Sequence, residues 1–377
     1  MKLLFASDSL KGSLSSMQTA DLLDKAAREV FRNIETIKVP MSDGGEGLID
    51  AVIAASGGKR EIVTVHDPLM GLIEAPYAIV KGKLAVIEMA MASGLTLIDG
   101  SMRDPRYTTS YGTGELIRHA LDSGCEYIVM GIGGSATNDG GMGALRALGA
   151  KFLDERGREL EGRGIDLTKL VAIDLSELDE RIQDVSFTVM CDVTNPLCGP
   201  NGATWVYGPQ KGGTPEMLEE LEAGMEKYRD LLYEVTGHNC DNVIGAGAAG
   251  GFGAASYAVL GAELRSGIDT MLGMLKFDDK LEGVDLVITG EGCADKQSVH
   301  GKVMQGVARR AEAKGIPVIG LVGSLGEGWE EVLKCGISRL ICITGGVVSA
   351  EEAMADPEKH YYDAALRMFE TYKDGSL

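Results

Sequence analysis

The sequence is poor in positive charge. Its 377 residues include 36 lysines and arginines against 56 aspartates and glutamates, which gives a formal net charge of −20. Proteins that bind nucleic acid or an anionic membrane surface need basic patches, because both partners are polyanions. The charge balance therefore argues against both partners.

Patterned cysteines and long apolar runs are also lacking. The seven cysteines are odd in number and form no Cys-x-x-Cys pair, which argues against a disulfide scaffold and a zinc site and favours a reducing compartment. The opening MKLLFASDSLKGS has an apolar run too short for a signal peptide, and no stretch approaches the length of a membrane span. We expect a cytoplasmic protein.

Glycine is abundant instead. The 52 glycines are about twice the ordinary share of roughly 7%, and they cluster in loops that follow short apolar runs. Such runs, each expected to be a strand, cover Lys2–Ser7, Glu126–Met130, Val284–Thr289, Ile316–Val322 and Leu340–Thr344. Strands that alternate with helices predict an α/β fold whose parallel sheets carry functional loops at the carboxyl ends of the strands.

One region departs from this alternation. From about Ile62 to Met89, strand-like runs are separated only by turn residues, a pattern that predicts hairpins in an antiparallel or mixed sheet. The length of the chain also favours two domains. We therefore expect one parallel-sheet domain built from residues 1–61 and 284–377, and a second, mixed α/β domain inserted at residues 62–283.

Two glycine-containing loops near the amino terminus carry charged side chains. Phosphate binding needs this mixture, because glycine lets backbone N–H groups approach oxygens, lysine neutralises charge and carboxylates hold Mg²⁺. In the loop Asp8–Ser13, Lys11 is placed to meet a phosphate or carboxylate near a helix start, although a surface lysine at a capped helix fits equally. In Pro40–Gly47, Asp43 and the Gly44–Gly45 pair favour function over a plain acidic turn.

Two further loops suit an anionic ligand. Thr108–Glu115 is rich in hydroxyls, including Ser110, but ordinary capping of a helix explains half of that pattern. In Gly131–Gly143, six of thirteen residues are glycine, which favours contact with a phosphate or a nucleotide over packing.

Carboxylates mark two loops in the second half of the chain. The segment from Thr289 to Lys302 contains Glu291 and Asp295 as potential metal ligands, and Lys302 can bind phosphate. Asp192 comes just after an apolar strand, where a general base or a metal ligand is often found, although its segment could be a mere turn.

Two nucleotide-binding motifs are absent or weak. The sequence GxxxxGK[ST] does not occur, so a P-loop kinase is excluded. Gly245–Gly250 matches GxGxxG, with Asp269 at a suitable distance, but a lone match without a clear preceding strand favours close helix packing over a dinucleotide. A nicotinamide-dependent dehydrogenase remains the rival enzyme, and a nucleotide or sugar-acid sensor without turnover remains the non-enzymatic alternative.

Eight motifs in a fixed order extend from Lys2 to about Gly345. They read DSLKGSLS, SDGGEG, TTSYGTGELI, GIGGSATNDGGMG, DVTNPLCGPNGA, YGPQKG, GAGAAGG and ITGEGCADKQSVHGK. Together they resemble the bacterial glycerate kinase family, which pairs a flavodoxin-like domain with a restriction-enzyme-like domain. Three departures are Leu10, Ser42 and Val303–Met304, and none of them removes a charged candidate.

The resemblance implies an ATP-dependent kinase that phosphorylates D-glycerate with Mg²⁺, at the 2-hydroxyl rather than the 3-hydroxyl in the branch it most resembles. The oligomeric state stays open. The residues expected to be catalytic are Lys11, Asp43 and Asp192. Those expected to bind Mg²⁺ are Glu291 and Asp295. Those expected to bind substrate or phosphate are Ser9, Gly44, Gly45, Ser110, Gly133, Gly134, Ser135, Thr137, Asn138, Asn195 and Lys302.

Overall fold

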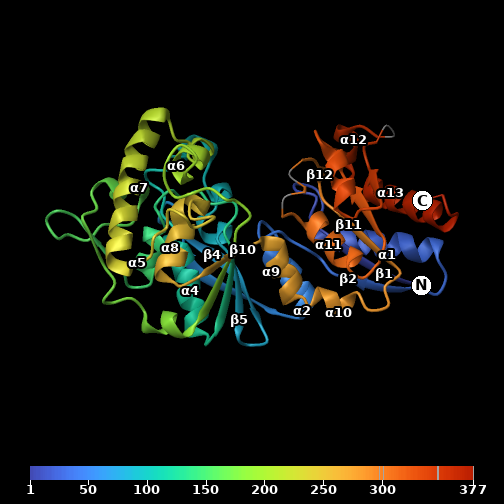
Figure 1. Ribbon diagram of the computed structural model, residues 1–377, viewed down its shortest axis with the longest axis horizontal. Helices are drawn as coiled ribbons and strands as arrows, with labels where there is room; N and C mark the ends of the chain where they lie inside the picture. Colours follow the sequence, from blue (N-terminus) through green and yellow to red (C-terminus); the bar gives the residue numbers. More distant parts are fainter. Residues whose placement is uncertain (297, 300, 346–347, 377) are drawn as a thin grey trace. The chain divides into compact units, whose positions relative to one another are not determined.

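The computed structural model describes residues 1–296, 298–299, 301–345 and 348–376, and has an α/β fold (Figure 1). The chain divides into two compact units. Unit 1 contains Met1–Asp43, Asp50–Gly57 and Ser266–Leu377, and unit 2 contains Gly44–Ile49 and Gly58–Arg265. The predicted α/β class is confirmed, whereas the domain limits at residues 61 and 283 and the family labels of the two domains stay predictions.

Unit 1 is built on a parallel sheet of five strands. They are β1 (Lys2–Ser7), β2 (Glu35–Lys38), β11 (Leu286–Gly290), β13 (Val318–Val322) and β15 (Arg339–Cys342). Their spatial order is β15-β13-β11-β1-β2, and every neighbouring pair is parallel. Counted along the chain this is the order 2-1-3-4-5 of flavodoxin-like sheets, in which the strand order reverses between the first and third strands. Here that reversal lies between β1 and β11.

Helices cover this sheet because its strands are apolar on both faces. Leu3 and Phe5 of β1 join a core with α1 (Ser16–Val30) and α13 (Pro357–Lys373), which pack against each other. Leu4, whose side chain points to the opposite face, is also fully buried. The other elements of this unit are α9 (Gly267–Met274), α10 (Phe277–Lys280), β12 (Cys293–Ala294), α11 (Val303–Glu312), β14 (Ser324–Leu325) and α12 (Ala350–Ala355). Helix α2 (Leu48–Ser56) begins in unit 2 and ends in unit 1.

Unit 2 contains a mixed sheet of six strands. They are β3 (Lys59–His66), β4 (Leu72–Val80), β5 (Leu84–Glu88), β6 (Tyr127–Gly131), β9 (Ser186–Met190) and β10 (Glu263–Arg265). Their order is β10-β9-β6-β5-β4-β3. The hairpins predicted between Ile62 and Met89 are confirmed, because β3, β4 and β5 pair antiparallel, while β5, β6, β9 and β10 pair parallel.

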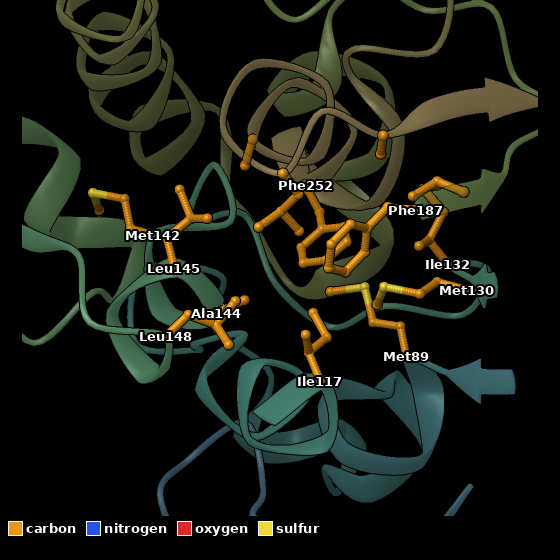
Figure 2. Close-up of a cluster of buried hydrophobic side chains, with 14 of the residues drawn as sticks. Met89, Ile117, Met130, Ile132, Met142, Ala144, Leu145, Leu148, Phe187 and Phe252 are labelled. Carbon is orange, nitrogen blue, oxygen red and sulfur yellow. The ribbon is translucent and has the colours of Figure 1, made fainter. Parts of the chain in front are cut away.

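A core of aliphatic, methionine and phenylalanine side chains lies beside this sheet. Figure 2 shows Met130 and Phe187 from the sheet together with Ile117, Leu145 and Phe252 from three helices. Those helices are α4 (Tyr111–Asp122), α5 (Met142–Ala147) and α8 (Phe252–Val259). The remaining elements of unit 2 are α3 (Ala90–Ser93), β7 (Lys151–Leu153), β8 (Ala172–Asp174), α6 (Ala203–Tyr207) and α7 (Pro215–Thr236). None of the helices in the described part of the chain has the length and apolar character needed to cross a membrane.

Candidate functional site

The carboxyl ends of the unit 1 strands open into a cavity of about 380 Å³. Its lining includes Asp8 and Ser9 after β1, Glu291 after β11, and Gly323 after β13. The cavity thus lies at the carboxyl ends of β1 and β11, the paired strands between which the strand order reverses, and ligands of open α/β sheets bind at such a reversal. The topology alone therefore favours this cavity as a ligand site.

Six of the predicted site residues line the cavity although they come from distant parts of the chain. These residues are Ser9, Lys11, Asp43, Glu291, Asp295 and Lys302. Parallel strands explain the convergence, because their carboxyl ends lie at one edge of the sheet whatever their separation in sequence. Lysines and carboxylates therefore share one cavity, as binding of a phosphate together with a cation requires.

The two lysines differ in their position relative to the helices. Lys302 is the N-cap of α11, where the backbone N–H groups of a helix start favour an anion. Lys11 lies in a tight turn in which Leu10 and Leu14 pair, and α1 begins only after its N-cap Ser15. The sequence placed Lys11 close to a helix start, whereas the structure places it in the turn before the helix.

Burial and mutual repulsion define the electrostatics of the carboxylates. Burial, together with the nearby Asp43, raises the pKa of Asp8 from 3.8 to about 7, although Lys11 acts in the opposite direction. Burial also raises the pKa of Glu291, and Asp43 contributes in the same direction. Lys302 opposes this increase from 3.9 Å, the distance between its Nζ and Oε2 of Glu291. A bound cation would relieve this repulsion.

The donor set fits Mg²⁺ held together with a phosphate. Glu291 is 5% exposed, and within the described residues its Oε1 has no hydrogen-bond partner. In that same part of the chain no three His, Cys, Asp or Glu side chains form a group that could hold a metal. Mg²⁺ in kinases is usually held by one or two carboxylates, by water and by the phosphates of the substrate. A complete protein cage is therefore not required.

Asp8→Asn is expected to stabilise the metal-free protein more at pH 8 than at pH 5. Because the pKa of Asp8 is higher in the folded state, its contribution to stability falls as pH rises from 3.8 to about 7. Asparagine mimics the protonated carboxyl, so its advantage at pH 8 should exceed that at pH 5 by roughly 2 kcal/mol. Urea unfolding at both pH values in EDTA measures the difference. An equal gain in stability at pH 5 and pH 8 would contradict the raised pKa of Asp8.

Unit 2 has its own group of predicted residues at the carboxyl edge of its sheet. Gly131 at the end of β6 pairs with Met190 at the end of β9, and Asp192 follows the second strand. The Gly44–Gly45 segment crosses these ends so closely that a Cβ on Gly131 would lie 2.2 Å from the carbonyl oxygen of Gly44. The Gly133–Gly134 pair is exposed beside it, as is Asp192. Two glycine loops and a carboxylate therefore meet at this edge.

A buried carboxylate that the sequence analysis did not single out fixes this edge. Glu88, the last residue of β5, is 2% exposed, and its Oε1 accepts a hydrogen bond of 2.7 Å from the backbone N–H of Ile49. It thereby holds the start of α2 just after the Gly44–Gly45 pair. The available signal was an acid at the end of an apolar strand, a position close to those of Asp8 and Glu291, which come directly after their strands.

A buried polar cluster supports the Gly131–Gly143 loop from within. Asp139 is fully buried, and its carboxylate accepts hydrogen bonds from the backbone and hydroxyl of Ser110 and from two glycine N–H groups. Lys211, 2% exposed, donates to the Thr137 carbonyl at 2.7 Å and to the Ser135 hydroxyl at 3.3 Å. Burial lowers the pKa of this lysine to about 8. The cluster therefore fixes the path of the loop.

Several predicted substrate contacts belong to this framework or to a neighbouring one. Ser110, Thr137 and Asn138 have no exposed surface, and the Asn138 amide donates to Thr204. Asn195 accepts from the Tyr207 hydroxyl and donates to a backbone carbonyl within its own loop. Their direct contact with substrate stays a prediction.

The GxGxxG segment has a packing role, as the sequence analysis favoured. A Cβ on Gly250 would lie 1.9 Å from the Thr137 carbonyl oxygen, and one on Gly247 would lie 2.1 Å from that of Pro196. The residues just before Gly245 form turns rather than a strand. The strand–loop–helix context of a dinucleotide site is therefore missing here.

Comparison with known proteins agrees with this arrangement of motifs. Residues 3–373 match the model of the family described as the glycerate kinase family. The chain belongs to the glycerate kinase family. The prediction that it is a kinase is thereby confirmed, and so is the resemblance on which that prediction was based.

Individual relatives cover nearly the whole chain. It is 46% identical over 354 residues to the "Glycerate 2-kinase" of Escherichia coli K12, with 94% of this chain and 93% of the relative covered. It is 43% identical to the "Glycerate kinase" of Halalkalibacterium halodurans, with 96% of each chain covered. A crystal structure from Salmonella typhimurium LT2, provisionally named glycerate kinase 2, matches with a TM-score of 0.89 at 43% identity, covering 100% of this chain and 99% of that one.

Proposed function

We propose that this glycerate kinase transfers the γ-phosphate of ATP to the 2-hydroxyl of D-glycerate in a reaction that requires Mg²⁺. The observation that carries the proposal is the unit 1 cavity, where two lysines and four carboxylates meet at the reversal of strand order. The choice of the 2-hydroxyl is supported by the E. coli relative, whose name specifies a 2-kinase.

The chemistry needs little covalent help from the protein. Phosphoryl transfer depends on holding the reacting oxygens in line and neutralising charge on the transferred group. Lys11 and Lys302 are suited to neutralise phosphate charge, and Glu291 with Asp295 would hold Mg²⁺. When bound, Mg²⁺ supplies further charge neutralisation on the phosphate oxygens. Asp43 lines the same cavity and is proposed to orient the reacting groups.

The loops of unit 2 are proposed to bind the hydroxy acid. Asp192 is exposed at the end of β9, where its carboxylate could orient or deprotonate the accepting hydroxyl. Gly133 and Gly134 are exposed, and backbone N–H groups of such a glycine pair suit the carboxylate of glycerate. The other proposed contacts in this unit are Gly44, Gly45, Ser110, Ser135, Thr137, Asn138 and Asn195.

A coupled assay with phosphorus NMR of the product tests the proposal. We expect release of ADP that requires D-glycerate, ATP and Mg²⁺ together, and a product signal of 2-phosphoglycerate. A signal of 3-phosphoglycerate would overturn the choice of hydroxyl. Binding of ATP and glycerate without release of ADP would indicate a sensor, and oxidation of glycerate with NAD⁺ in place of ATP, forming NADH, would indicate a dehydrogenase.

A further inference from the structure

One end of the unit 1 cavity is apolar and lies beside the short helix α12, whose residues are not buried by other parts of the chain. The lining there is supplied by Leu10, Ile343, Ala350, Ala353, Met354 and Pro357. Helix α12 has no buried residue, and Met354 is 56% exposed. A large apolar side chain is thus kept open to the cavity rather than packed into the core.

Glycerate does not account for this apolar end. Each of its three carbons carries oxygen, so it would gain nothing from an alkyl surface, and such a small acid would fill only part of about 380 Å³. In the same cavity, Ile343 follows β15 at one edge of the sheet, whereas the carboxylates and Lys11 follow β11, β1 and β2. Lys302 lies 3.9 Å from Glu291. A ligand that fills the whole cavity must therefore be anionic at one end and flat or apolar at the other.

We propose that the apolar end, formed by α12 together with Leu10 and Ile343, is the subsite for the purine ring of the nucleotide, whose phosphates extend to Lys11 and Lys302. This inference rests on the proposed function, since it places the base of the ATP invoked there. Aromatic rings bind well on alkyl surfaces, and the thioether of Met354 adds a favourable contact of sulfur with the ring.

The lining between the two ends is suited to the sugar. Ser324 follows β13, which lies between β15 and β11 in the sheet, and Thr344 follows β15. Both line the cavity, and their hydroxyls donate to the carbonyl oxygens of Gly292 and Gly323 at 3.4 and 3.1 Å. Each hydroxyl oxygen keeps lone pairs that can accept a hydrogen bond from a ribose hydroxyl. The sequence of anionic, hydroxyl-bearing and apolar surface thus follows the order of phosphate, ribose and base in a nucleotide.

Comparing ATP with inorganic tripolyphosphate isolates the contribution of the base. Calorimetry with Mg²⁺ present should show that the wild-type protein binds ATP at least about tenfold more tightly than tripolyphosphate, as an apolar subsite worth 1.4 kcal/mol or more would give. Met354→Ser should weaken ATP binding by about three- to tenfold. It should leave tripolyphosphate binding and the KM for glycerate unchanged.

A filling variant and a matched control sharpen the test. Ala353→Phe occupies the subsite and should raise the KM for ATP by about tenfold or more. Met102→Ser removes a similarly exposed methionine from unit 2, at 60% exposure. It should change the binding of neither ATP nor tripolyphosphate. The thermal midpoint of each variant reports on its folding.

Three outcomes distinguish a failure of this inference from a failure of the proposed function. If the wild-type enzyme phosphorylates glycerate with ATP but Met354→Ser and Ala353→Phe bind ATP normally, the purine subsite is wrong and the kinase assignment stands. A parallel loss of ATP and tripolyphosphate binding in Met354→Ser would also overturn the subsite. If the wild-type protein shows no ATP-dependent turnover, the proposed function fails, and the subsite fails with it.

Discussion

Asp192→Asn is expected to lower kcat by about 10²- to 10⁴-fold, the usual loss when a general base is removed, while the thermal midpoint stays close to that of the wild type. The side chain is exposed in the loop after β9, so a change from carboxylate to amide costs little packing. The substitution keeps the shape and removes the charge. Steady-state kinetics with D-glycerate, together with thermal unfolding, measures both effects.

A structural role for Asp192 would give a different result. Asparagine caps turns nearly as well as aspartate, so a carboxylate that only fixes the loop could be replaced with little loss of activity. Asp184→Asn is a suitable control, since it changes an exposed aspartate of the same unit that precedes β9 instead of following it. Near-native kcat for Asp192→Asn would end the catalytic assignment.

The sequence was sufficient to predict where the unit 1 residues would converge. Asp8 and Glu291 each come directly after an apolar strand, and parallel strands bring such positions to one edge. The hairpins after Ile62 could also be predicted from the sequence, because only turn residues separate their strands. Both features follow from local sequence pattern together with the general rule that alternating strands and helices form a parallel sheet.

Features that depend on three-dimensional packing could not be predicted in this way. The glycines of Gly131–Gly143 favoured ligand contact in the sequence, yet a Cβ on Gly143 would lie 2.0 Å from the Thr109 hydroxyl oxygen, and one on Gly140 would lie 2.7 Å from the Tyr228 ring. Only the Gly133–Gly134 pair is exposed. Glycine thus allows close packing at some positions of this loop and ligand access at others. Only the neighbours in the folded structure show which role each glycine has.

Lys211 illustrates the same difficulty for charged residues. In sequence it belongs to a glycine-containing turn where a surface lysine is the ordinary expectation. In the structure its ammonium group is buried against the Thr137 carbonyl, some 70 residues away along the chain. Nothing near it in sequence indicates this partner. A buried polar network of this kind becomes visible only once the fold brings its members together.

Glu291→Gln is expected to lower kcat by about 10³-fold and, at the same time, to make the metal-free protein more stable at pH 8. The loss of rate follows from the proposed metal site, where charge stabilisation by Mg²⁺ is worth several kcal/mol. The gain in stability follows from burial, which raises the pKa of Glu291, and from repulsion by Asp295 and Asp43. A neutral amide of the same shape removes both costs.

The sign of the stability effect depends on pH. Because the pKa of Glu291 is higher in the folded state, the wild type loses stability as pH rises above the unfolded value of 4.5, while the glutamine variant does not. The gain should be present at pH 8 and should vanish at low pH, where the carboxyl is protonated in both the folded and the unfolded wild type. Urea unfolding in EDTA at several pH values measures it.

Opposite changes in activity and stability distinguish a metal ligand from a structural carboxylate. Neutralising a carboxylate that stabilises the fold would make the protein less stable. Neutralising one that lies in a repulsive cluster to bind a cation would make the metal-free protein more stable. Glu327→Gln, on an exposed residue of the same unit outside the cavity lining, should change neither quantity. Wild-type activity in Glu291→Gln at saturating Mg²⁺, or a loss of stability at pH 8, would contradict the assignment of Glu291 as a metal ligand.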